Sequence, residues 1–169
     1  MNSEKIISEL AANRQVFSGL LSGIGKEMHE WRSNPESWNL QEIVCHLYDE
    51  EREDFRARTK HVLETPGLPL SPIDPVGWVQ SRNYMQQDYG QMLEKFLEER
   101  SASVSWLRSL TDPAWHNAHI HPKFGPMPAK MFLANWLAHD HLHIRQIARL
   151  KFEYLKSTSG ETLQYAGAW

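Results

Sequence analysis

Apolar residues spaced three and four apart constrain the fold of this chain more than any other feature of its sequence. Residues at this interval share one face of an α-helix, and that face must be buried against another element. Turn-forming or proline-rich clusters separate the segments that carry the pattern, which are 3–29, 39–63, 79–110 and 128–156. Four amphipathic helices in 169 residues predict one all-α domain, an up-down four-helix bundle.

Local signals place the helix boundaries. Asn39 can cap the second helix while Glu42 reaches back to it, and Pro128 suits the first turn of the fourth helix. Prolines at 66, 69, 72 and 75 form a loop that no helix can cross.

The remaining segments lack helical spacing. Residues 114–127 predict an irregular connection, and no segment alternates in the manner of a β-strand. The polar tail at 157–169 is expected to pack on the bundle through Tyr165 and Trp169. We therefore predict a single domain over residues 1–169.

Charge and composition narrow the class of function. A net charge of −3 and a pI of about 6.3 argue against nucleic acid as a partner. The chain has no long apolar run for a membrane and no apolar leader after Glu4 and Lys5. One cysteine, Cys45, suits the reducing cytoplasm and is expected to be a buried hydrophobe. We expect a cytoplasmic protein that acts on a small molecule.

Two histidines four residues apart lie on the apolar face of the fourth helix. His139 and His143 share that face with Trp136 and Ile147, so both imidazoles point inward, whereas His141 points outward. Neutral imidazole is the commonest protein ligand of zinc, and this spacing is a frequent way to present two ligands. The alternative is that each ring satisfies a hydrogen bond in the core.

The second helix favours the metal interpretation. His46 lies within its apolar stripe, beside Ile43 and Leu47. Glu50 follows one turn later, where a carboxylate is costly to bury unless it is near a cation. Glu50 is therefore either a proton acceptor beside the metal or part of a solvated charge run. Three further histidines precede Pro122 and are expected to be structural or surface residues: His116, His119 and His121.

Two segments resemble the DinB-like superfamily. They are WNLQEIVCHL at residues 38–47, followed by an acidic run, and HDHLHIRQI at residues 139–147. The resemblance implies a four-helix bundle with a metal held by three histidines, one from the second helix and two from the last. At the matching positions these ligands are His46, His139 and His143.

The resemblance also implies a class of chemistry. Three protein ligands leave a coordination position for water or substrate, which is typical of a catalytic site. We expect one divalent transition metal, zinc first and otherwise nickel, iron or manganese, that activates water or a low-molecular-weight thiol. The enzyme would be a thiol transferase or a hydrolase with Glu50 as its base. The alternative is a non-catalytic, metal-binding or stress-linked protein, and a homodimer is expected in either case.

Overall fold

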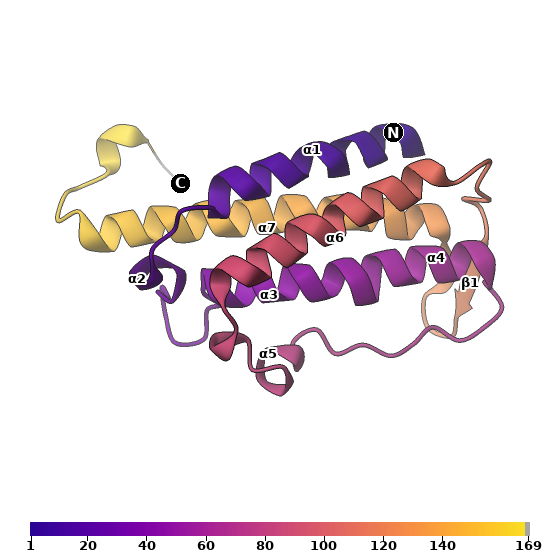
Figure 1. Cartoon of the computed structure of the whole chain (residues 1–169), viewed down its shortest axis with the longest axis horizontal. Coiled ribbons are helices and arrows are strands. Elements are labelled where there is room, and N and C mark those ends of the chain that lie inside the picture. The colour runs from indigo at the N-terminus through magenta and orange to yellow at the C-terminus, as the bar shows by residue number, and fades with distance from the viewer. Residues whose placement is uncertain (168–169) are drawn as a thin grey trace.

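The computed structural model describes residues 1–167 as a bundle of four long helices with a small hairpin at one end (Figure 1). The long helices are α1 (Ser3–Leu21), the continuous run of α3 (Leu40–Asp49), the π-helix η1 (Glu50–Arg56) and α4 (Ala57–Glu64), then α6 (Tyr89–Ser109), and α7 (Ala129–Thr158). Short helices lie between them, namely α2 (Lys26–His29), α5 (Trp78–Ser81) and η2 (Tyr84–Gln86), and η3 (Gln164–Ala166) follows α7. The predicted four-helix bundle is confirmed.

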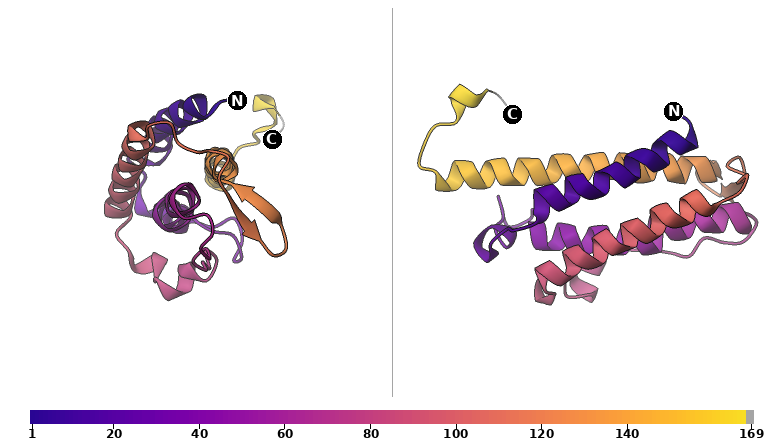
Figure 2. Two further views of the ribbon diagram at one scale, coloured as in Figure 1. Left: turned by 90° about the vertical axis from the view of Figure 1, so that its right-hand side faces the viewer. Right: turned by 45° about the horizontal axis from the view of Figure 1, so that its top comes forward.

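The predicted up-down alternation of helix direction is wrong. The second and third long helices run parallel. Two hydrogen bonds show this, since Gln41 donates to the carbonyl of Gln87 near the start of both helices and Arg56 donates to Ser103 further along both. The first and fourth long helices also run side by side in the same direction (Figure 2). Each remaining neighbouring pair is antiparallel.

The proline-rich segment explains this topology. The second long helix covers residues 40–64 and is about 37 Å long at ~1.5 Å per residue. Residues 65–77 form no helix, and an extended chain of about 13 residues spans roughly 43 Å. Arg58 and His61 donate to the carbonyls of Ser71 and Leu68, which holds the segment along the helix. The chain can therefore return to the starting end before the third helix begins.

Two helix boundaries differ from those predicted. The first helix ends at Leu21, and Gly23 follows in the left-handed region with φ 71°. The third begins only at Tyr89, because Asn83 is left-handed and Asp88 caps the new helix by accepting from the amide of Gln91. Apolar spacing continues through both breaks, since short helical turns keep the same faces inward.

The second and fourth long helices begin close to the residues that were predicted. Asn39 accepts a hydrogen bond from the amide of Glu42, and the Glu42 carboxylate accepts from the amide of Asn39. This is the predicted capping box. Pro128 is the N-cap of α7, one position before the predicted first turn.

The connection before α7 is more regular than predicted. Strands β1 (Ala118–His121) and β2 (Gly125–Pro128) pair antiparallel, although no strand was expected. Their turn is stabilised locally, because His121 Nδ1 accepts from the amides of Lys123 and Phe124. Four-residue strands are too short to produce a clear alternating pattern.

The tail differs from the expectation that it packs on the bundle. Between residues 159 and 167 only Leu163 is even partly buried, and Tyr165 is fully exposed. Trp169, the second expected anchor, lies outside the described residues.

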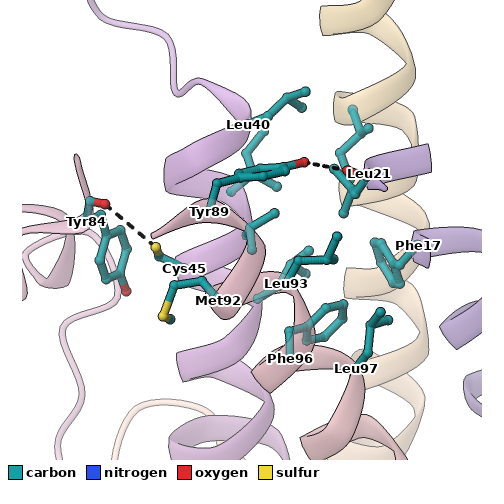
Figure 3. Close-up of a cluster of buried hydrophobic side chains, with 14 of the residues drawn as sticks. Phe17, Leu21, Leu40, Cys45, Tyr84, Tyr89, Met92, Leu93, Phe96 and Leu97 are labelled. Atoms are coloured by element: carbon teal, nitrogen blue, oxygen red, sulfur yellow. Dashed lines mark hydrogen bonds between the residues drawn. The ribbon is translucent and has the colours of Figure 1, made fainter. Parts of the chain in front are cut away.

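Apolar side chains fill one end of the bundle between α1, α3 and α6 (Figure 3). Phe17 and Phe96 pack edge to face with ring centroids 5.2 Å apart, and the Tyr89 hydroxyl donates to the carbonyl of Leu21. Cys45 is fully buried here, and burial raises the pKa of its thiol to about 12. The prediction that Cys45 is a buried hydrophobe is confirmed.

A buried ionic network crosses the middle of the bundle. The guanidinium of Arg100, 1% exposed, donates to both carboxylate oxygens of Glu51 and both of Asp140. The Trp136 indole donates to Glu51, and the Asn13 amide donates to Asp140. The network therefore joins all four long helices.

The π-helix η1 brings consecutive carboxylates into the interior. Its hydrogen bonds span five residues instead of four, which changes the direction of the side chains relative to an α-helix. Glu50, Glu51 and Phe55 are all buried in this segment. Glu51 reaches Arg100, while Glu50 is not part of that network.

Replacing Arg100 should test how much the fold depends on this network. Arg100→Met leaves two buried carboxylates without their cation, and we expect the free energy of unfolding to fall by about 3–5 kcal/mol. Urea unfolding followed by circular dichroism measures the change. The control is Lys26→Met, which removes an exposed i,i+4 pair with Glu30 and should cost below about 0.5 kcal/mol. Equal losses in the two variants would contradict the central role of Arg100.

Candidate metal centre

Three histidines from two helices converge in the bundle. His46 lies on α3, and His139 and His143 lie one turn apart on α7. The Nε2 atom of His139 is 3.3 Å from that of His46 and 3.0 Å from that of His143. Two metal–nitrogen bonds of ~2.05 Å at a tetrahedral angle would separate their nitrogens by roughly 3.3 Å. Two of the three nitrogen pairs thus lie close to the separation that one metal ion requires, and all three ligand atoms lie within 4.8 Å of one another.

Aromatic rings hold the imidazoles in place. Trp38 packs edge to face on His46 with centroids 4.8 Å apart, and Phe55 lies 4.9 Å from His139. His46 and His143 are buried, while His139 is partly exposed. Access to the three nitrogens is therefore greatest on the His139 side.

Burial keeps all three imidazoles neutral. Burial lowers the pKa of His46 to about 3 and that of His139 to about 2, and each is lowered further by the neighbouring histidines. Burial also lowers the pKa of His143 to about 4, although Gln146 and Asp140 oppose the shift. A neutral imidazole has the free lone pair that a metal needs, so no proton competes for these nitrogens near pH 7.

The hydrogen-bond pattern also fits a metal. His139 Nε2 faces two other Nε2 atoms, and a single ring nitrogen cannot donate to one and accept from the other at once. The Nδ1 atom of His46 is buried and has no hydrogen-bond partner. These rings are therefore not placed to satisfy one another in the core, and a divalent ion among the Nε2 atoms would use all three lone pairs.

Glu50 lies one turn beyond His46 and is only 4% exposed. Its Oε1 atom has no hydrogen-bond partner, and its carboxyl group shares a hydrogen bond with Asp54. Burial, followed by the nearby Asp54, raises the pKa of Glu50 to about 8. Glu50 is therefore a buried carboxyl group that can hold or release a proton near neutral pH, and not part of a solvated charge run.

The other candidate histidines do not join this cluster. His116 is exposed, His119 Nδ1 lies 3.3 Å from the carbonyl of Pro66, and His121 stabilises the hairpin turn. His141 is exposed, as predicted. Within residues 1–167 the sole group of histidine, cysteine or carboxylate ligands close enough to share an ion is His46, His139 and His143.

Sequence reasoning missed three neighbours of the site. Asp54 appeared to belong to a surface charge run, Phe55 followed that run, and Trp38 preceded the helix. The signal that could have found Asp54 is its spacing of four from Glu50. Phe55 and Trp38 gave no comparable signal, because a single aromatic residue is expected in any core.

Comparisons with known proteins agree with this fold. The family model of the DinB superfamily matches residues 9–147. One solved structure, YfiT from Bacillus subtilis, is described as a probable metal-dependent hydrolase with an unusual four-helix bundle topology. It aligns with a TM-score of 0.79 at 20% sequence identity, over 90% of this chain and 87% of that chain. None of the curated proteins matches the chain.

No helix within residues 1–167 combines the length and the apolar character that crossing a bilayer requires.

The pKa of His143 predicts how the stability of the metal-free protein depends on pH. The folded pKa of about 4 lies below the unfolded value of 6.5, so the unfolded state binds more protons between these values. Stability is therefore lost as pH falls below about 6.5. His143→Gln should reduce this slope by about one proton, or ~1.4 kcal/mol per pH unit, between about pH 5 and 6. Urea unfolding at several pH values in a chelating buffer measures it.

The exposed residue His141 provides the control for this experiment. His141→Gln should leave the slope unchanged, because His141 is exposed and lies outside the buried cluster. An unchanged slope in the His143 variant would mean that this ring is not held neutral by the fold.

Proposed function

The chain belongs to the DinB superfamily, and we propose that it is a hydrolase that depends on one divalent metal ion held by His46, His139 and His143. The observation that carries the proposal is the convergence of three neutral Nε2 atoms at 3.0 and 3.3 Å. YfiT, which has a similar fold, is described as a probable metal-dependent hydrolase, and this favours hydrolysis over other reactions. Transfer of a low-molecular-weight thiol would use the same donor set and is the second choice.

The donor set indicates which ion and which chemistry to expect. Three imidazoles suit zinc first, and nickel, iron or manganese would also accept these ligands. When bound, such an ion supplies Lewis acidity and lowers the pKa of a water or thiol that it holds. The neutral histidines help because they leave the charge of the ion undiminished.

The surroundings favour catalysis over a purely structural ion. No fourth histidine, cysteine or carboxylate within residues 1–167 completes the cluster, so a position remains for water or substrate. A hollow in the surface reaches His139, so that a small molecule could approach this position. In a non-catalytic metal protein we would expect a protein side chain to fill the fourth coordination position and no surface hollow to reach the histidines.

Glu50 would act as the proton acceptor. Its unpartnered Oε1 can take a proton from the attacking group, since a base with a pKa near the working pH transfers protons efficiently. Asp54 shares a hydrogen bond with Glu50 and lines the hollow beside His139, so it connects Glu50 with solvent. Phe55 lines the same hollow and contacts the His139 ring, with centroids 4.9 Å apart.

Metal content tests the ligand assignment. We expect about one equivalent of a transition metal in protein purified without a metal-affinity tag, and none in the His139→Ala, His143→Ala double variant. Elemental analysis measures both, alongside a His116→Ala, His119→Ala control that should keep its metal. A wild-type protein that takes up neither zinc nor nickel would overturn the proposal.

Glu50→Gln separates proton transfer from metal binding. The amide has nearly the same shape but cannot accept the proton, so we expect turnover to fall about 100-fold with the metal content unchanged. Hydrolysis of a panel of nitrophenyl esters and anilides measures turnover. Glu53→Gln, in the same π-helix but paired with Arg82 at the surface, is the control and should keep its activity. Full activity in the Glu50 variant would exclude Glu50 as the base.

A further inference from the structure

A hollow of about 400 Å³ lies against His139, on the more exposed side of the three-histidine cluster. Its apolar walls come from η1, β2 and α7, and consist of Phe55, Met127, Met131, Phe132 and Leu142. Leu142 follows His139 by three residues on α7, so the two side chains are neighbours on the helix surface. The apolar walls are therefore continuous with the proposed metal ligand.

The hollow offers little free charge to a bound molecule. Its charged residues are Asp54 and Arg58, which form an ion pair with 2.8 Å between Arg58 Nε and Asp54 Oδ1. Arg58 also donates to the carbonyl of Ser71. The amide nitrogen of Asn135 is engaged with the carbonyl of Met131. A charged substrate group would have to break these interactions, whereas an apolar group would not.

A second hollow near the site has a different character. It is lined by Trp38 and Gln146, and also by the charged residues Arg149 and Glu153. None of the three histidines lines it. The apolar hollow is therefore the better route to the nitrogens of the cluster.

The side chains around the hollow can adapt to a ligand. Met127 and Met131 are partly buried, and unbranched thioether side chains adjust readily to different apolar shapes. Leu142 is 54% exposed although it lies at the edge of this hollow. A bound alkyl or aryl group would cover these side chains and remove apolar surface from water.

We propose that this hollow binds the apolar part of the substrate. The substrate class is a small, uncharged molecule with an alkyl or aryl group next to the bond that is cleaved. This inference rests on the proposed metal-dependent function and adds the specificity residues Met131 and Leu142. The volume of the hollow suits a group of modest size, since ligand pockets usually enclose about 300–1,000 Å³.

Hydroxamates of different chain length provide the test. Acetohydroxamate and hexanohydroxamate carry the same metal-binding group and differ by four methylenes. Each buried methylene should tighten binding by about twofold to fourfold, so hexanohydroxamate should bind at least about 15 times more tightly. Isothermal titration calorimetry on protein carrying one equivalent of zinc measures the ratio of the two affinities.

Variants of the apolar residues that line the hollow test whether it is the site that favours the longer hydroxamate. Leu142→Gln and Met131→Gln should bring the ratio of affinities down to about 3 or less, because a polar amide replaces the apolar contact. Leu155→Gln is the matched control, since Leu155 is 52% exposed on the same helix but does not line the hollow. This control should keep the ratio of the wild-type protein.

The outcomes separate this inference from the proposed function. If both hydroxamates bind zinc-loaded protein with equal affinity, the apolar hollow does not bind substrate, and the metal site stands. If the Leu142 and Met131 variants keep the wild-type ratio of affinities, the alkyl group of the hydroxamate binds elsewhere and the inference is overturned. If neither hydroxamate binds, or zinc is not taken up, the proposed metal-dependent function fails and this inference fails with it.

Discussion

The paired carboxylates around Arg100 are the interaction on which the rest of the structure depends. Removing three charges from water is costly, and this cost is offset only when the partners meet with good geometry. Arg100 meets Glu51 and Asp140 through four hydrogen bonds, so the rotation of α6, η1 and α7 about their axes is fixed. Asp140 adjoins His139 and Glu51 adjoins Glu50. The rotation that forms the ion pairs therefore also directs the site residues.

The histidine cluster could be predicted from the sequence, because the spacing of apolar residues along each helix shows which face points inward. His139 and His143 share a helical face with Trp136, and His46 lies in the apolar stripe of its own helix, so each is seen to point inward without knowledge of the partner helix. Membership in the bundle family follows from the same residues.

Other features depend on information that periodicity lacks. Apolar spacing is the same in a helix that runs up or down, so the parallel second and third helices were not foreseen. Arg100 looks like an ordinary exposed residue, and its burial becomes clear only once Glu51 and Asp140 lie opposite it. The hollow beside His139 combines residues from η1, α4, β2 and α7, and no local pattern could bring these segments together.

The π-helix has a consequence for the comparison of this chain with its relatives. A π turn holds one residue more than an α turn, so a relative with a regular α-helix here would lack one residue of Glu50–Arg56. A correct alignment would then open a gap in the middle of a helix, where alignments rarely place one. Without that gap the columns shift by one position, or about 100° of rotation. Glu50 would then be matched to the counterpart of Glu51, and the proposed proton acceptor would be mistaken for the partner of Arg100.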